Sequence, residues 1–430
     1  MGGDKGAYDI VIAGGGMIGT SLALALAPLN LRVAVVEAIA RKENQQPSFD
    51  DRSTALSRST QRMFEAMGLW DEVVAASTPI TNIHVSDKGR FGFSHIDAGE
   101  QGVEALGYVI INRVLGEVLQ SRLNASSSVD VYCPARIDSI TLGSDQATAR
   151  LTSEGGDETL SCRLLIAADG AGSAVREMMG ISVSKREYGQ RAVIGNLLPE
   201  KRIENRAFER FTPQGPLAIL PVADARAGFI WTVSENDAER VLALDDDAFL
   251  AEIQEEFGYR LGKFSSVGKR AAYPLILSKA LRLTATRSVL IGNSAHGLHP
   301  VSAQGFNLGM RDVAALCDCI ADAHKKGSEP FMSVSEKGSD PFLLGEGFDP
   351  GDAALLDRYA TWRRSDQTKL VHFTDNLVRL FGSKRPGLRT LRNIGMLGFD
   401  LVPGVRPAFA KHTMGLAGEL PRLSRGVPIR

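Results

Sequence analysis

The sequence predicts an α/β protein in which a parallel-sheet unit, built from three separated stretches of chain, is interleaved with an antiparallel-sheet unit. Three stretches indicate buried parallel strands: Tyr8–Ala13, 162–168 and 289–291. Each is a short apolar run that ends in glycine and polar residues and is followed by a helical pattern. Between the last two, residues 182–277 change to shorter segments typical of antiparallel strands.

Length and composition limit the class of protein. The chain has 430 residues, enough for two or three domains, with 44% hydrophobic and 23% charged residues. The formal net charge of −1 gives no reason to expect a nucleic-acid partner. Four cysteines are too few for a disulfide framework and fit a reducing compartment. Neither a signal peptide nor an apolar run of about 20 residues is present, so we expect a cytoplasmic protein without a transmembrane span.

The first element is a Rossmann-type unit. Its parts are the strand Tyr8–Ala13, the helix Thr20–Ala27 and the strand Arg32–Val36. Between the first two, Gly14, Gly16 and Gly19 satisfy the pattern G-x-G-x-x-G, which provides a tight turn, close approach of a pyrophosphate, and helix–strand packing. Glu37 follows the second strand, where an acid accepts hydrogen bonds from an adenosine ribose. These features together predict dinucleotide binding.

Three further polar residues near strand or helix ends are candidates for cofactor contact. Arg52 lies just before a helix start and is either a phosphate contact or an ordinary surface arginine. Arg113 lies in the first turn of a helix that begins at Asn112. Asp169 ends the buried strand 162–168 and either binds a ligand hydroxyl or caps the following helix.

The second unit is predicted from its alternating segments. Its expected strands are Ala192–Asn196, Arg206–Phe211, Leu217–Pro221 and Gly228–Ser234. The helix Asp246–Gly258 follows, with an apolar stripe that we assign to the core: Phe249, Leu250, Ile253 and Phe257. We expect this unit to cover the substrate.

The third strand, 289–291, leads into a loop with two histidines. The loop contains His296, His299 and Pro300, and a helix opens at Gly305. A helix start after a glycine-broken loop presents backbone N–H groups to a ligand. The H-x-x-H spacing suggests a metal, but no nearby cysteine or pair of carboxylates completes a ligand set, so we predict none.

The C-terminal part is predicted to be helical after a surface insertion. Residues 326–352 contain a six-residue duplication and are expected to form an inserted loop. Residues 353–381 form a long amphipathic helix. Residues 388–418 are rich in Leu, Met and Phe, and either pack against the body or a second subunit, or contact a membrane surface or lipid tail.

The chain thus divides into seven segments. Those of the cofactor domain are 1–78, 111–181 and 281–325; those of the substrate domain are 79–110 and 182–280; the insertion is 326–352 and the helical region 353–430.

Three separated motifs resemble a known family. GGGMIG with Glu37, LLIAADGAGSAVRE and VLIGNSAHGLHPVSAQGFNLGMRD are similar to the three FAD fingerprints of the class A flavoprotein aromatic hydroxylases. RSTALS, and His299-Pro300 with QGFNLG, resemble the ubiquinone-biosynthesis hydroxylases in particular. The resemblance implies a para-hydroxybenzoate hydroxylase-like fold: a Rossmann-type FAD domain, an interleaved substrate domain and a C-terminal helical region.

Asn293 is a departure from the pattern. Most of the superfamily has aspartate at this position, where it binds the flavin ribityl chain. Asparagine can still accept and donate hydrogen bonds but carries no charge. The 2-octaprenyl-6-methoxyphenol hydroxylase branch is similar in having asparagine here, so the departure favours that branch.

The resemblance also implies a chemistry and a site. NAD(P)H reduces FAD, O2 adds to the flavin, and a C4a-hydroperoxide hydroxylates a polyprenylated phenol of ubiquinone biosynthesis. The cofactor-binding residues implied are Gly14, Gly16, Gly19, Glu37, Arg52, Arg113, Asp169, Asn293, Gly305, Asn307 and Leu308. His299, Pro300 and Gly305 would surround the flavin ring. As base for the phenol, none of His84, His95, Tyr188, Tyr273 and Arg210 is preferred.

The implied partners are the hydrophobic substrate and O2, with a homo-oligomer expected. A ubiquinone-biosynthesis complex and peripheral membrane contact are further expectations. Two alternatives stay open: a hydroxylase of a small soluble phenol, which the Leu/Met/Phe-rich tail disfavours, and a flavin-binding scaffold without turnover, which only Asn293 supports.

Overall fold

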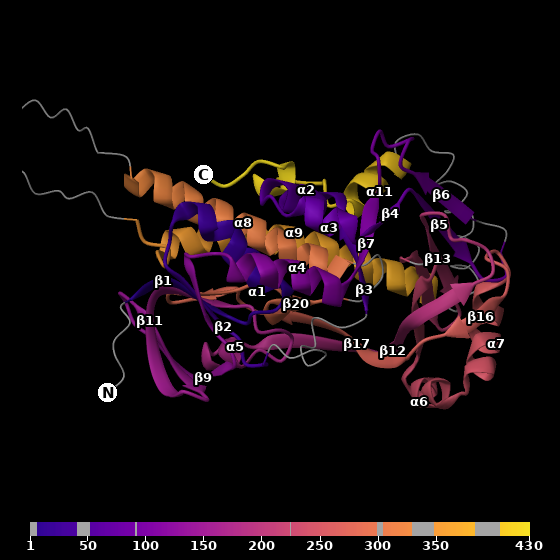
Figure 1. The fold of residues 1–430 in the computed structure, drawn as a ribbon, viewed down its shortest axis with the longest axis horizontal. Helices are drawn as coiled ribbons and strands as arrows, with labels where there is room; N and C mark the ends of the chain where they lie inside the picture. The colour runs from indigo at the N-terminus through magenta and orange to yellow at the C-terminus, as the bar shows by residue number, and fades with distance from the viewer. Residues whose placement is uncertain are drawn as a thin grey trace, which may run out of the picture.

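The computed structural model describes residues 7–40, 52–90, 93–223, 225–298, 304–328, 348–382 and 405–430. These residues form three sheets and the helices that cover them. Figure 1 shows a sheet with β1 and β11 at one end of an elongated molecule and a sheet with β13 and β16 at the other, with the long helix α9 running between them.

The first sheet is mainly parallel and has the order β18-β19-β11-β1-β2-β8, with the hairpin strands β9 and β10 beside β11. Its strands are β1 (Tyr8–Ala13), β2 (Val33–Val36), β8 (Val129–Tyr132), β9 (Ala135–Leu142), β10 (Ala147–Ser153), β11 (Gly156–Ala167), β18 (Thr284–Ala285) and β19 (Ser288–Leu290). The central strands are buried on both faces, which explains their continuous apolar sequences.

Helices from distant segments cover this sheet. They are α1 (Met17–Leu26), α4 (Asn112–Asn124), α5 (Ala174–Met178), α8 (Gln304–Ser328) and α9 (Ala353–Gly382). The helix predicted over Thr20–Ala27 begins three residues earlier, because Gly16 caps it directly after the turn.

The second sheet has the order β20-β17-β12-β15-β14-β13-β5-β6, with β16 beside β12. Its strands are β5 (Asn82–Asp87), β6 (Phe93–Asp97), β12 (Val183–Pro199), β13 (Arg206–Thr212), β14 (Gly215–Pro221), β15 (Ala227–Ser234), β16 (Phe264–Val267), β17 (Ala271–Ala280) and β20 (His296–Gly297). The sheet was expected to be antiparallel, but β13 and β5 pair in parallel. No hairpin joins these two strands, so no turn fixes their direction.

Helices α6 (Glu235–Ala243) and α7 (Asp246–Phe257) cover one face of the second sheet. The predicted apolar stripe of α7 lies in this core, with Phe249 and Ile253 fully buried. Phe229 and Phe249 stack at a ring distance of 5.6 Å, which ties α7 to β15.

A third, small sheet connects the other two. It has the order β3-β7-β4, made of Ser53–Ser57, Gly107–Ile111 and Thr78–Ile80. Helices α2 (Arg58–Ala66), α3 (Trp70–Ala75) and α11 (Val405–Thr413) lie on the same side of the molecule in Figure 1.

The ends of the predicted insertion are ordered. Helix α8 continues to Ser328, and Asp349 forms a two-pronged ion pair with Arg287 at 2.8 and 2.9 Å. Residues 329–347 lie outside the described residues, and with them most of the duplication. The seven-segment division remains a prediction.

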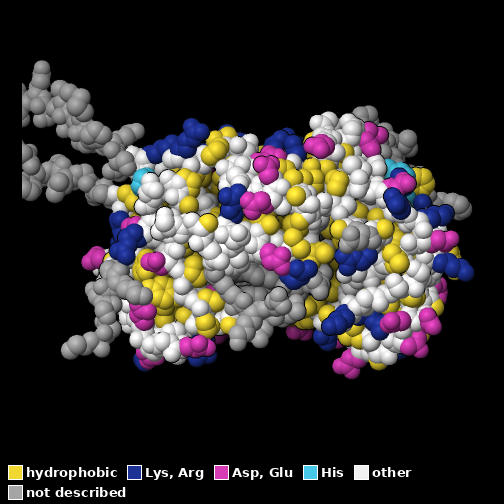
Figure 2. Space-filling view, viewed as in Figure 1, with side chains coloured by type: hydrophobic (Ala, Val, Ile, Leu, Met, Phe, Trp, Pro, Cys, Tyr) yellow, Lys and Arg dark blue, Asp and Glu magenta, His cyan; other side chains and the backbone are white. Residues whose placement is uncertain are grey.

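Charges of both signs are dispersed over the surface. On the face shown in Figure 2, Lys and Arg alternate with Asp and Glu among apolar side chains. Across the parts of the chain that the structure describes, no helix is both long and apolar enough to span a membrane.

Candidate active site

The glycine turn after β1 meets two steric requirements. Gly14 has a φ of +106°, and a Cβ on it would lie 2.5 Å from the carbonyl oxygen of Ala168 on the neighbouring strand. A Cβ on Gly19 would collide with the carbonyl oxygen of Gly14. Gly16 is the N-cap of α1 and provides no side-chain acceptor, so the first N–H groups of the helix are not capped by that residue. This turn is suited to a phosphate at the start of α1.

Glu37 lies at the end of β2 and braces this turn. One carboxylate oxygen accepts the N–H of Gly15 at 2.7 Å, and the other accepts the N–H of Ile39 at 2.8 Å. Each oxygen keeps a lone pair for a further donor such as a ribose hydroxyl. The sequence predicted contact with a ligand; the structure adds a role in holding the turn.

Arg52 and Arg113 come together through the pairing of β3 with β7. The N–H of Asn112 donates to the carbonyl of Arg52 at 2.8 Å, so Arg113 directly follows this junction. The Arg52 guanidinium lies over the Tyr273 ring, 4.7 Å from its centroid, and Arg113 forms an exposed ion pair with Glu117 at 2.7 Å. Their contact with a cofactor remains a prediction.

Gln120 is a residue that sequence reasoning missed. Its side-chain amide donates to the carbonyl of Gly15 at 3.3 Å, so α4 supports the glycine turn. Gln120 lies seven residues after Arg113, two helical turns further along the same face, which is the signal that could have identified it.

Asp169 follows β11 beside the same turn. Its Oδ2 accepts the N–H of Val175 at 3.1 Å, as expected for a residue that caps a helix. Its Oδ1 is buried and has no hydrogen-bond partner among the described residues. A buried acceptor without a donor is costly, so this oxygen fits the hydroxyl group of a bound cofactor.

The third motif has an exposed turn and an open helix start. Asn293 is exposed within the turn Gly292–Ser294, while Leu308 is fully buried. A Cβ on Gly305 would meet no atom within 4 Å, so the first turn of α8 has open space beside it. His299 and Pro300 lie outside the described residues.

The side chain of Asn307 fastens the start of α8 to β3. Its Oδ1 accepts from the N–H of Ser57 at 2.9 Å and from the Thr60 hydroxyl at 2.8 Å. Its amide donates to the carbonyl of Ala55 at 2.8 Å. The sequence predicted that Asn307 contributes backbone groups; its buried side chain has a structural role besides.

The buried carboxylate of Asp312, in α8, holds the loop that follows β19 through hydrogen bonds. It accepts the N–H of Gly292 at 2.9 Å, and His296 Nε2 lies 2.6 Å from the same oxygen. Arg363 of α9 donates to the other oxygen at 2.7 Å. Although burial alone opposes its ionisation, His296 and Arg363 hold the pKa of Asp312 below its usual range. His296 is therefore engaged in shaping the loop.

Helix α9 contacts this cluster along one face. The Tyr359 hydroxyl donates to the carbonyl of Leu290 at 3.1 Å, and Gln367 donates to Asp312 at 3.3 Å. Asp366 accepts from Arg363 at 2.6 Å and from Arg311 at 3.0 Å. The spacing of these residues over two turns is that of a single helix face.

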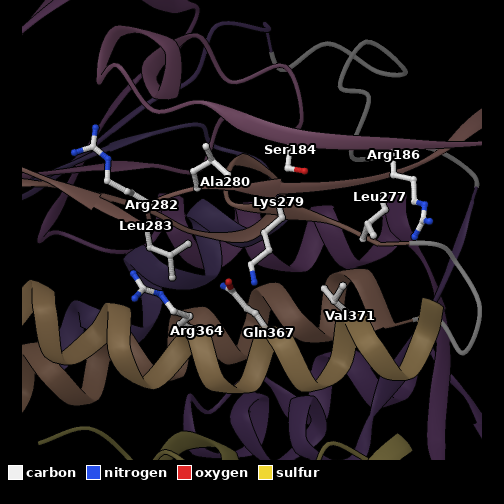
Figure 3. Close-up of a pocket in the computed structure, with 11 residues that line it drawn as sticks. Ser184, Arg186, Leu277, Lys279, Ala280, Arg282, Leu283, Arg364, Gln367 and Val371 are labelled. Atoms are coloured by element: carbon white, nitrogen blue, oxygen red, sulfur yellow. The ribbon is translucent and has the colours of Figure 1, made fainter. Parts of the chain in front are cut away.

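A pocket of about 380 Å³ lies between α9 and strands β12 and β17. Figure 3 shows Arg364, Gln367 and Val371 on α9 facing Leu277 and Lys279 on the strand above. Its charged lining is basic: Arg186, Lys279, Arg282 and Arg364. None of its lining residues belongs to the predicted cofactor site.

The candidate bases are not equivalent. His84 and His95 contact each other at 2.5 Å, and burial lowers the pKa of His84 to about 3. The Tyr188 hydroxyl donates to Asp375, and Arg210 donates to the carbonyl of Glu256. Tyr273 lies under Arg52. The residues of this set thus have structural partners of their own.

Comparisons with known proteins agree with this geometry. The family model of an FAD binding domain matches residues 7–333. The chain is 35% identical to ubiquinone hydroxylase UbiL of Rhodospirillum rubrum, over 98% of this chain and 93% of that protein. It is 30% identical to 3-demethoxyubiquinol 3-hydroxylase of Escherichia coli, over 95% and 98%. The structure of p-nitrophenol 4-monooxygenase PnpA from Pseudomonas putida superposes with a TM-score of 0.77 at 18% identity, covering 96% of this chain and 99% of that one, which shows a shared fold.

Proposed function

Because the chain belongs to the FAD-binding domain family and is an FAD-dependent monooxygenase, we propose that it hydroxylates the ring of a polyprenylated phenol of ubiquinone biosynthesis, of the 2-polyprenyl-6-methoxyphenol type. NAD(P)H is the proposed electron donor and a flavin C4a-hydroperoxide the proposed oxygen carrier. The observation that carries the substrate class is the end-to-end match to two proteins whose names are those of ubiquinone-pathway hydroxylases.

The proposed cofactor contacts follow the chain from one end of FAD to the other. Gly14, Gly16 and Gly19 would receive the pyrophosphate, and Glu37 the adenosine ribose. Arg52 and Arg113 would support the phosphate and ribityl portions, while Asp169 and Asn293 would hold the middle. The buried Oδ1 of Asp169 supports this assignment, since no described residue donates a hydrogen bond to it and a ligand hydroxyl would.

The flavin ring is proposed to lie at the start of α8. Gly305, Asn307 and Leu308 would offer backbone groups there, and His299 and Pro300 would complete the surroundings. The positive end of a helix dipole stabilises negative charge on a reduced ring. When bound, FAD supplies the electron transfer and the activated oxygen, and the protein positions the substrate and excludes water.

The other partners of the protein are also proposals. Because the proposed substrate is an apolar prenyl phenol, we expect peripheral contact with a membrane surface. A homo-oligomer and membership of a ubiquinone-biosynthesis complex are also proposed.

Deletion of the gene followed by mass spectrometry of extracted quinones tests the function. We expect a prenyl-phenol intermediate to accumulate and the quinone pool to fall, with recovery from a plasmid copy. A plasmid that encodes Gly14→Ala is the matched negative control, since it should not bind FAD. A normal quinone pool in the deletion strain would contradict the proposal.

The purified enzyme provides a second test. We expect FAD to copurify and a polyprenyl phenol to stimulate NAD(P)H oxidation more than a short, soluble phenol does. If the soluble phenol stimulates NAD(P)H oxidation equally, the protein would instead be assigned as a hydroxylase of small phenols. Bound FAD with no stimulation by any phenol would favour a scaffold.

A further inference from the structure

Glu209 of β13 faces away from the helices that cover the second sheet. Its two neighbours both contact α7: the Phe208 ring lies 5.4 Å from the Phe257 ring, and Arg210 donates to the carbonyl of Glu256 at 2.9 Å. Because successive side chains of a strand alternate between faces, Glu209 projects from the opposite face.

This opposite face is turned toward the third sheet. Ala207 and Leu220 lie on it, and they pack with Ile80 of β4 and Val109 of β7. Strand β3 also approaches it, since a Cβ on Gly228 of β15 would lie 2.9 Å from the Ser53 hydroxyl.

The same strand β3 leads to the predicted flavin site. Asn307, which lies two residues after Gly305 in α8, binds Ala55 and Ser57 of β3. At Gly305 itself the helix start has open space beside it. The face that carries Glu209 and the first turn of α8 are therefore both in contact with one short strand.

Glu209 is part of a row of partly buried side chains across the sheet. The row follows the strand register from β5 to β12: Val85, Glu209, Ala218, Ile230 and Ile194. On the opposite face the equivalent positions are sealed, with Phe208 5%, Ile219 0% and Phe229 2% exposed. The row thus retains access beside it, and its surface is apolar except for one carboxylate.

Among the side chains that the structure describes, none forms a hydrogen bond or ion pair with the carboxylate of Glu209. A partly buried carboxylate in apolar surroundings is costly unless a ligand compensates for it. A phenol on this face would place its ring on the apolar row and its hydroxyl at Glu209.

Building on the function proposed above, we propose that Glu209 accepts the proton of the substrate's phenol hydroxyl. In this step the O–H bond breaks, its electron pair stays on the phenol oxygen, and the proton moves to a carboxylate oxygen of Glu209. The phenolate ring that results is more electron-rich and is the better acceptor of an electrophilic oxygen. The proton leaves Glu209 for water after the product departs.

The electrostatics of the site support this role. Burial raises the pKa of Glu209 to about 7, and no charged side chain among those that the structure describes contributes to that shift. Its neighbours on β5, β14 and β15 are Val85, Ala218 and Ile230. On the packed elements, Asp87 lies two residues along β5 from Val85, and Asp375 of α9 binds Arg186 and Tyr188. A base with a pKa near the working pH is effective in proton transfer.

The test compares Glu209→Gln and Glu209→Asp with wild type in the FAD-loaded enzyme. Glu187→Gln, an exposed glutamate on β12 of the same sheet, is the control. We expect Glu209→Gln to retain FAD and its reduction by NAD(P)H, but to lower phenol hydroxylation by roughly 100-fold. The rise of wild-type kcat/KM through pH 7 should disappear in Glu209→Gln and persist in Glu209→Asp and in the control.

A second measurement does not depend on turnover. A raised pKa means that the native state binds more protons than the unfolded state between about pH 4.5 and 7. Wild type should therefore lose stability relative to Glu209→Gln as the pH rises through this range, and a pH-independent difference would overturn the proposal. If wild type hydroxylates the phenol and Glu209→Gln does so with the same rate and pH profile, the role of Glu209 is overturned and the proposed function is not. A wild type that hydroxylates no phenol would overturn the proposed function and this inference together.

Discussion

Gly14 shows how one backbone position shapes the proposed cofactor site. Its φ is +106°, and a Cβ at this position would lie 2.5 Å from the carbonyl oxygen of Ala168, so a side chain is excluded. We expect Gly14→Ala to destabilise the protein by about 1–3 kcal/mol and to abolish FAD binding, because the turn must shift away from β11. Urea denaturation and the flavin absorbance of the purified protein measure both effects.

Gly180 provides the control for that substitution. It also has a positive φ, of +66°, but a Cβ there would meet no atom within 4 Å. Gly180→Ala should cost about 1–2 kcal/mol from backbone strain alone and should retain FAD. Equal loss of flavin in the two variants would show that the contact with Ala168 is not what matters.

Asn307 offers a second test at the scale of one residue. In Asn307→Asp a carboxylate oxygen would replace the amide that donates to Ala55. We expect a loss of about 1–3 kcal/mol in stability and an increase in the Kd for FAD of about tenfold, equivalent to about 1.4 kcal/mol. Asn236→Asp, in the exposed first turn of α6, should change neither. An unchanged Kd for FAD in Asn307→Asp would show that the contact of Asn307 with β3 does not support flavin binding.

The residue scale also shows where sequence reasoning ends. The glycine pattern is predictable because its three positions have a fixed spacing within six residues of chain, although the contact that excludes a side chain at Gly14 is with the distant Ala168. The partners of Asn307 lie 247 to 252 residues away, so no local pattern encodes its side-chain role. Glu209 was missed for the same reason: its environment is created by strands that the chain brings together from separate segments.

At the scale of elements, α9 is fixed to α8 through buried charges. Arg363 is 2% exposed and Asp312 is 0% exposed, with 2.7 Å between them. Removing one member of such a pair leaves the other uncompensated, so Asp312→Asn should cost about 3–5 kcal/mol. In a double-mutant cycle with Arg363→Met we expect a coupling of about 0.5–3 kcal/mol, measured by equilibrium unfolding.

The pair Asp312–Arg363 should also make the stability of the protein depend on pH in acid. The pKa of Asp312 is lowered in the folded state, so its contribution is present above its unfolded value of about 3.9 and is lost as the pH falls below it. The stability difference between wild type and Asp312→Asn should therefore shrink in acid. Asp357→Asn, which changes an exposed carboxylate of α9, should show no such trend. A constant difference down to pH 3 would contradict this assignment.

Helix α9 illustrates what amphipathic patterning can and cannot predict. Its existence and length followed from periodicity, and the helix is observed over Ala353–Gly382. Its charged residues would ordinarily be placed on the solvent side, but Arg363 is buried because it meets Asp312. Periodicity identifies apolar faces; it does not identify pairs of charges that compensate each other.

At the scale of the whole molecule, FAD should act as a structural ligand. Its proposed contacts come from the first, second and third cofactor segments, so binding should stabilise their assembly. At about 100 times the Kd, binding to the native state alone adds about 2.7 kcal/mol. We expect the Tm of the apoprotein to rise with FAD and to rise less with FMN, which lacks the adenosine that Glu37 is proposed to bind. Calorimetry with each ligand tests this, and equal shifts would contradict the proposed adenosine site.

The overall architecture was largely predictable, because β1, β11 and β19 are each an apolar run followed closely by glycine. Two features were not. The short strand His296–Gly297 leaves the cofactor loop to pair with β17, and β5 joins β13 in parallel. Both depend on pairings between distant segments, for which a sequence has no local marker.

The order of strands in the first sheet also has a consequence for synthesis of the protein. β1 is complete at residue 13, but its neighbour β11 ends at residue 167 and β19 at residue 290. At translation rates of about 5–20 residues per second, β1 waits roughly 8 to 30 seconds for β11. During that time an apolar strand emerges from the ribosome without its central partner, and it requires protection from aggregation. The proposed flavin site is not complete until β19 and the helices after it have been made, so we expect cofactor insertion to be among the last events of folding.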